Sequence, residues 1–125
     1  MTNKSKKILA EISAGELLDK MTILEIKLTK IKDKENLLEI SKEYESLKET
    51  KRLNIKTTTK IESLFSELKK INLNLWYIED KIRICEKNKD FGKNFILTMK
   101  FPYISKNATY LSYISKRSVF YNQNI

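Results

Sequence analysis

The sequence predicts an all-α fold, an antiparallel helical bundle of two to three long helices followed by short C-terminal helices. Two observations support this prediction. The chain has only 2 glycines and 1 proline among its 125 residues, so it carries little turn chemistry. Apolar residues also recur every three or four positions in two long stretches, 14–33 and 59–88, as one face of a helix requires.

The first predicted helix, residues 14–33, begins at a capping box. The Ser13 hydroxyl can accept a hydrogen bond from the Glu16 amide, and the Glu16 carboxylate can reach back to the Ser13 amide. The apolar face of this helix is broad, which indicates contacts with more than one neighbour. The face consists of Leu17, Leu18, Met21, Ile23, Leu24, Ile26, Leu28 and Ile31.

Two further long helices follow polar joints in the chain. The second, residues 36–53, carries glutamates that we expect to pair with lysines on a solvated face rather than to bind metal. The third, residues 59–88, is predicted to begin at a second capping box, Thr59–Glu62, and to end where Gly92 adopts a left-handed conformation. Its apolar seam consists of Ile61, Leu64, Leu68, Ile71, Leu75, Ile78, Ile82 and Cys85.

The C-terminal part of the sequence predicts two shorter helices on either side of a proline. These helices are expected at 93–101 and 108–117, and Pro102 stops or kinks the first of them. The predicted domain organisation is an N-terminal arm at 1–12, a helical bundle domain at 13–118 and a loose C-terminal tail at 119–125.

Composition excludes several classes of chemistry. The chain has no histidine, which removes imidazole acid–base catalysis, Ser–His and Cys–His nucleophiles and ordinary zinc sites. Its single cysteine, Cys85, lies on the apolar seam and is interpreted as a packing residue. One cysteine without a disulfide partner favours a cytoplasmic location. No run of 18 apolar residues occurs, so no membrane span is expected.

The charge balance is strongly basic, with a formal net charge of +9. This invites a nucleic-acid hypothesis, but lysine outnumbers arginine 22 to 3, and base-specific contacts usually use arginine. We therefore interpret the charge mainly as a compositional bias spread over solvated faces. Arg52, Arg83 and Arg117 run against this bias, which indicates that a planar guanidinium is needed at those positions.

A stripe of polar and aromatic residues lies one position beyond the seam of the third helix. It consists of Phe65, Asn72, Trp76, Glu79, Arg83 and Glu86. Trp76, the only tryptophan, is interpreted as a packing anchor or a subunit contact rather than a platform for a ligand.

This stripe predicts a candidate site if the first and third helices run antiparallel, because the start of one would then lie near the end of the other. Glu16, Asp19 and Lys20 would approach Arg83 and Glu86. Such a cluster could bind an anion through its cations, or a divalent cation such as Mg²⁺ through its carboxylates. A structural salt-bridge network that fixes helix register explains the same residues, and we favour that interpretation.

Two stretches of the sequence resemble an uncharacterised family of small bacterial proteins. The first runs from Gly15 to Lys27 and reads GELLDKMTILEIK. The second runs from Leu75 to Glu86, reads LWYIEDKIRICE, and continues through Phe91–Ile96. The resemblance spans most of residues 13–115 and implies no known activity.

The same resemblance points to the polar cluster without naming a ligand. It carries over Gly15, Glu16, Leu17, Asp19, Lys20, Trp76, Glu79, Asp80, Arg83 and Glu86. Lys100 stands where the family tends to have arginine, whereas Tyr103 matches the family pattern. Both residues join the ligand-binding candidates that the resemblance implies.

The favoured functional hypothesis is a protein–protein interaction or assembly module, present as a homodimer. The third helix has a long apolar seam and the first has a broad apolar face. Five helices, two of them short, are not expected to cover both of these surfaces within one chain. The alternative is a small enzyme or ligand-binding protein for a phosphorylated or sugar-nucleotide compound. Arg83 and Lys20 would hold the anion, and Glu79 or Glu16 would act as base or Mg²⁺ ligand. Nucleic-acid binding is a second alternative, and it predicts affinity that falls steeply with salt.

Overall fold

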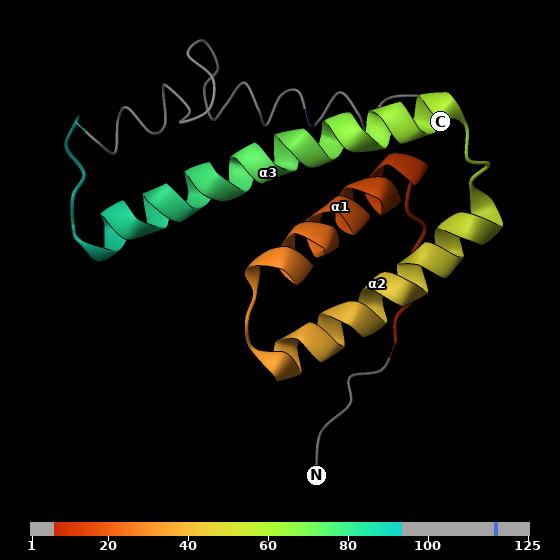
Figure 1. Cartoon of the computed structure of the whole chain (residues 1–125), viewed down its shortest axis with the longest axis horizontal. Helices are drawn as coiled ribbons and strands as arrows, with labels where there is room; N and C mark the ends of the chain where they lie inside the picture. The colour runs from red at the N-terminus through yellow and green to blue at the C-terminus, as the bar shows by residue number, and fades with distance from the viewer. Residues whose placement is uncertain (1–6, 94–116, 118–125) are drawn as a thin grey trace.

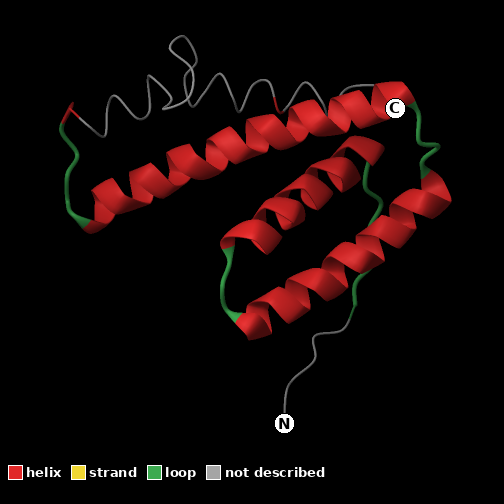
Figure 2. Cartoon of the chain, in the orientation of Figure 1, coloured by secondary structure: helices red, strands yellow, loops and turns green. Residues whose placement is uncertain are grey.

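The computed structural model describes residues 7–93 and residue 117, and this part of the chain consists of helices and loops (Figure 1, Figure 2). Helix α1 spans Ala14–Lys30, α2 spans Lys34–Asn54 and α3 spans Thr59–Lys87. The all-α prediction is confirmed. None of these helices has the length and apolarity that crossing a bilayer demands. The predicted helices at 93–101 and 108–117 fall almost wholly outside the described residues, and the tail at 119–125 falls entirely outside them.

The start of α1 is capped as the sequence predicts. The Ser13 hydroxyl accepts a hydrogen bond from the Glu16 amide at 3.1 Å, so the helix begins immediately after this residue. Its end comes earlier than expected, because Ile31 is extended with ψ 135°. Only the three residues 31–33 separate α1 from α2, and such a short connection makes the two helices antiparallel neighbours.

Both ends of α3 differ from the prediction in detail. The capping residue is Thr58 rather than Thr59, and its hydroxyl accepts a hydrogen bond from the Ile61 amide at 3.2 Å. At the other end, Lys89 takes the left-handed conformation with φ 53°, whereas Gly92 does not. The reason is positional: the helix is capped at Asn88, so the turn falls on the next residue, before the glycine is reached.

Helix α1 lies between α2 and α3 and packs against both of them (Figure 1). Helices α1 and α3 start at the same end of the bundle (Figure 1), where Leu18 shares a core cluster with Ile61, and the last residue of α1, Lys30, meets Tyr77 farther along α3. These two helices are therefore parallel, and the expected antiparallel arrangement of the first and third long helices is wrong. Two short joints each reverse the chain, and two reversals restore the original direction.

One carboxylate ties the three helices together. Glu25 of α1 accepts a hydrogen bond from the Tyr44 hydroxyl of α2 at 3.2 Å and pairs with the Lys69 ammonium of α3 at 2.8 Å. Burial of the phenol raises the pKa of Tyr44, and the negative charge of Glu25 raises it further. The contact therefore fixes both neighbours of α1 at one level of the bundle.

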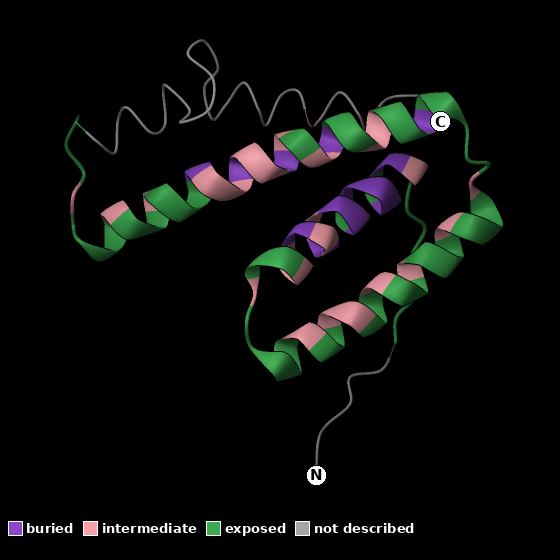
Figure 3. Ribbon diagram, viewed as in Figure 1, coloured by how far each residue is buried: buried purple, intermediate pink, exposed green. Residues whose placement is uncertain are grey.

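The core is centred on α1, whose residues are buried toward both neighbours, whereas α2 has no buried residue (Figure 3). The prediction that the broad face of α1 serves more than one partner is confirmed. The buried residues on the seam of α3 all lie between Ile61 and Ile78, and the later seam residues Ile82 and Cys85 are only half-buried. The buried apolar residues are Leu17, Leu18, Met21, Leu24, Ile26, Ile61, Leu68, Leu75 and Ile78.

Candidate functional site

The charged residues of the candidate site do not converge. Lys20 projects toward α2, where its ammonium pairs with Glu43 at 2.8 Å. Arg83 pairs with Asp80, one turn earlier on its own helix, at 3.1 Å. The expected meeting of the start of α1 with the end of α3 is wrong because these helices are parallel. The residues on α1 therefore face the first half of α3 rather than its last turns.

The remaining candidates are placed as follows. Glu16, Glu79 and Glu86 are exposed, and Trp76 is half-buried on α3. Lys100 and Tyr103 lie outside the described residues. Among the residues that the structure describes, no three acidic or cysteine side chains gather closely enough to hold a metal ion.

Asp19 behaves differently from the other candidates, because it is only 4% exposed and lies at the centre of a polar cluster. The Asn72 amide donates hydrogen bonds to the Asp19 carboxylate and to the Thr22 hydroxyl, both at 2.7 Å. The Thr22 hydroxyl in turn donates to the backbone carbonyl of Asp19, also at 2.7 Å. We call Asp19, Thr22, Asn72 and Arg117 the buried polar cluster.

Arg117 completes the cluster from 98 positions along the chain. Its Nε lies 3.1 Å and 3.2 Å from the two carboxylate oxygens of Asp19, and a terminal nitrogen lies 2.7 Å from the second of them. This forked contact uses the planar geometry that lysine lacks. The chain therefore returns from the far end of α3 to the middle of the bundle.

The chemistry of the buried polar cluster is structural in character. Every buried side-chain nitrogen and oxygen of the described residues has a hydrogen-bond partner, so no group of the cluster is held ready for a ligand. The salt-bridge interpretation favoured from the sequence fits this geometry, although its partners are Asn72 and Arg117 rather than Arg83 and Glu86.

The four residues of the buried polar cluster differ in how clearly the sequence marks them. Asn72 appeared in the stripe but not among the site candidates, and Arg117 was marked only because it runs against the lysine bias. Thr22 carried no signal, since an isolated threonine on an apolar face is common. A parallel arrangement of α1 and α3 would have placed Asn72 opposite Asp19.

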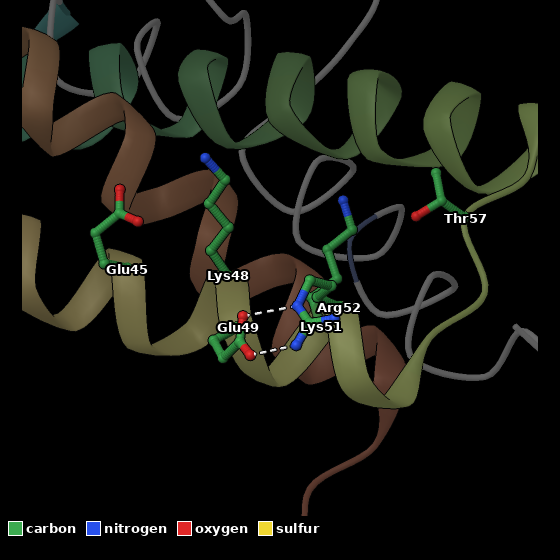
Figure 4. Close-up of a pocket in the computed structure, with 6 residues that line it drawn as sticks. All are labelled: Glu45, Lys48, Glu49, Lys51, Arg52 and Thr57. Atoms are coloured by element: carbon green, nitrogen blue, oxygen red, sulfur yellow. Dashed lines mark hydrogen bonds and ion pairs between the residues drawn. The ribbon is translucent and has the colours of Figure 1, made fainter.

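A pocket of about 330 Å³ lies elsewhere, between the second half of α2 and the loop that leads to α3 (Figure 4). At its edge Arg52 donates two hydrogen bonds to the carboxylate of Glu49, at 2.8 Å and 2.6 Å. These hydrogen bonds lower the pKa of Glu49 and raise that of Arg52. The pocket is lined by Glu45, Lys48, Glu49, Lys51, Arg52 and Thr57.

Comparison with known protein families assigns the chain to one of them. A family model matches residues 8–112 of the 125 residues. The chain belongs to the family of unknown function DUF6165. The match contains all the site candidates from Glu16 to Tyr103, whereas Arg117 lies beyond its end. No curated protein and no solved structure matches the chain.

Proposed function

We propose that this protein is a protein–protein interaction module that assembles with a second copy of itself through its N-terminal arm, of which the structure describes residues 7–12. The observation that carries the proposal is the exposure of three aliphatic side chains on this arm. Ile8 is 89% exposed, Leu9 is 95% exposed and Ile12 is 51% exposed. Such a run of exposed aliphatic residues is typical of a surface that is covered in an assembly. The arm also lies within the region that matches the family, which begins at residue 8.

A groove along α2 supports the choice of a second copy as the partner. The groove has a volume of about 670 Å³, and it is lined by Lys7, at the end of the described arm farthest from α1, and by α2 residues that include Ile40 and Leu47. The arm runs from the start of α1 past α2 (Figure 1), and it reaches the groove at Lys7, which directly precedes Ile8 and Leu9. In a twofold dimer each arm would lie in the groove of the other copy.

The energetics are consistent with this geometry. Full burial of one leucine or isoleucine contributes roughly 1.5–3 kcal/mol, and two symmetric arms bring six such side chains. Association itself costs an estimated ~4–15 kcal/mol. One arm alone is therefore a weak anchor, whereas a reciprocal exchange of arms is sufficient for a dimer.

The arrangement of the charged candidates also favours binding over catalysis, because Lys20 and Arg83 are engaged in ion pairs away from each other.

The same chemistry bears on location. Cys85 is free, and a protein without disulfides suits the reducing cytosol, which we propose as its compartment.

The experiment is sedimentation equilibrium of the full chain and of a variant that carries Ile8→Ser and Leu9→Ser. The unchanged chain is expected to give twice its mass of 14.8 kDa, and the variant is expected to give the monomer. Leu53→Ser is the matched control, because Leu53 is also exposed but lies on α2 outside the groove. A monomer for the unchanged chain, or equal dissociation in the control, would overturn the proposal.

A further inference from the structure

We propose that the pocket between α2 and the α2–α3 loop binds a small phosphorylated molecule. The pocket's volume of about 330 Å³ is at the lower end of the range for small-molecule sites and exceeds what a bare phosphate needs. It is separate from the buried polar cluster and from the groove beside the arm. Its lining residues carry three cations and two carboxylates.

The charges of the lining residues do not cancel at the centre of the pocket. Glu49 is fully engaged by Arg52 through two short hydrogen bonds, so this pair is neutral and fixed. Of the other charged lining residues, Lys48 and Lys51 carry two positive charges and Glu45 carries one negative charge, so the lining has a net positive charge. Neither lysine forms an ion pair with any residue that the structure describes.

The two lysines are placed to act together. They are three positions apart, which puts them on one face of α2, and both side chains extend from α2 toward the side where α3 lies (Figure 4). The Lys51 ammonium lies 5.0 Å from the centre of the Phe65 ring, and this cation–π contact holds it across the gap between the helices. The hydroxyl of Thr57 faces the same space and adds a neutral donor (Figure 4).

The chemistry of these groups favours a phosphate over a carboxylate or a neutral ligand. Two ammonium groups offer six donors that can rotate, and a phosphate presents three acceptor oxygens with up to two negative charges. Lysine binds phosphate as a point charge and needs no planar fork. The volume left beside a phosphate suits a sugar-sized body, and the Arg52 guanidinium has further N–H donors besides the two that bond to Glu49.

Lysine side chains surround the pocket at this end of the bundle. The positive dipole ends of α1 and α3 lie here, at Ser13 and Thr58, and the negative dipole end of α2 lies here too, at Asn54, so the attraction for an anion comes from the lysines. A neighbouring pocket of about 320 Å³, between Ala14 of α1 and the start of α3, is lined by Lys56 and Lys60 and by no carboxylate. An anion approaching this end therefore meets several cations before it reaches Lys48 and Lys51.

The test is isothermal titration of the full chain with glucose 6-phosphate, with inorganic pyrophosphate and with glucose. Both phosphates are expected to bind and glucose is not. Replacing both lysines in a Lys48→Met, Lys51→Met variant is expected to weaken phosphate binding by roughly tenfold or more, as the loss of charge-assisted hydrogen bonds predicts. Lys48→Met alone covers the case in which loss of the Lys51 contact with Phe65 unfolds the chain, and it is expected to weaken binding severalfold.

The matched control removes the same charge at the other end of α2. A Lys32→Met, Lys34→Met variant lowers the net charge equally, and both of its positions are exposed and distant from the pocket. It is expected to change phosphate binding less than twofold. Equal weakening in both double variants, or no heat with either phosphate at millimolar concentration, would overturn the proposal. Tighter binding of a single-stranded oligonucleotide that is lost equally in both variants would do the same, since it would assign the charge to nucleic acid.

Discussion

The two halves of α3 carry the same sequence pattern and end in different environments. In the first half, up to Ile78, four of the six seam residues are buried, and the flanking stripe contributes Asn72 to the buried polar cluster. In the second half the stripe residues Glu79 and Arg83 are exposed, and the seam is only half-buried. Asn72 and Glu79 are seven residues apart and occupy equivalent positions of the heptad.

The difference between the two halves of α3 comes from its neighbour α1 rather than from the sequence of α3. Helix α1 has 17 residues and α3 has 29, and the two run parallel from the same end of the bundle. The last residue of α1, Lys30, lies against Tyr77, with 2.7 Å between its ammonium and the phenol oxygen. Beyond that point α3 has no partner in α1. A polar residue on the stripe is therefore buried where α1 runs alongside it, as at Asn72, and exposed beyond the end of α1, as at Glu79.

The largest expected difference between the halves is electrostatic. Asp19→Ala removes the carboxylate that Arg117 and Asn72 share, and leaves a partly buried guanidinium without it. We expect a loss of roughly 3–5 kcal/mol in the free energy of unfolding, measured by urea titration. Arg83→Ala breaks an exposed ion pair in the second half and is expected to change stability by less than about 0.5 kcal/mol. A comparable loss in both variants would show that the two halves are equally coupled to the core.

A second pair of variants locates the boundary between the halves. Ile78 is 1% exposed, whereas Ile82, the next residue of the same seam, is only half-buried. Ile78→Ala is expected to cost roughly 2–5 kcal/mol because it leaves a cavity. Ile82→Ala is expected to cost about 1–2 kcal/mol, since water already reaches part of this side chain. The same chemical denaturation assay measures both, and an equal cost at Ile82 would move the boundary toward the end of the helix.

The start of the packed half can be tested through its cap. Thr58→Ala removes the hydroxyl that accepts the Ile61 amide and is expected to cost about 1 kcal/mol. Thr59→Ala is the matched control, because alanine is a better helix former than threonine and no capping bond is lost; it is expected to be neutral or slightly stabilising. Thermal unfolding of both variants distinguishes the two positions. The reverse order would place the cap at Thr59, where the sequence alone predicts it.

The smallest expected effect is a pH dependence from the contact that joins α2 to the packed half. Because the pKa of Tyr44 is raised in the folded chain, the folded state holds the phenol proton more tightly than the unfolded state. This contribution to stability is fully present below the unfolded pKa of about 10 and is lost as the pH rises through the folded pKa. Tyr44→Phe should therefore reduce the decline in thermal midpoint above that pH. An unchanged alkaline decline would remove Tyr44 as its source.

Periodicity and capping chemistry predict the three long helices to within a few residues at each end, because both depend on local sequence. The Ser13 cap, the broad face of α1 and the seam of α3 as far as Ile78 follow from spacing alone. The relative direction of α1 and α3 does not, since a 3.5-residue period fits parallel and antiparallel neighbours equally well. The lengths of the two joints carry that information, and they favour two reversals of the chain.

The site was harder to predict because it depends on that direction. Asp19 is a candidate from the sequence because an antiparallel arrangement would bring it to Arg83 and Glu86, whereas in the structure it faces Asn72. The lysine bias made Arg117 conspicuous, yet its partner is 98 positions away, beyond the reach of local pattern. Lys48 and Lys51 resembled ordinary residues of a solvated helix, and only the gap between α2 and α3 distinguishes them.

The contact between Asp19 and Arg117 has a consequence for synthesis on the ribosome. Translation delivers α1 first and the arginine almost a hundred residues later. Until that residue leaves the exit tunnel, the nascent chain holds an acidic side chain at the centre of its bundle without its cation. The contact is therefore completed only after residue 117 has been made, and a chain that stops short of Arg117 is expected to have a looser core.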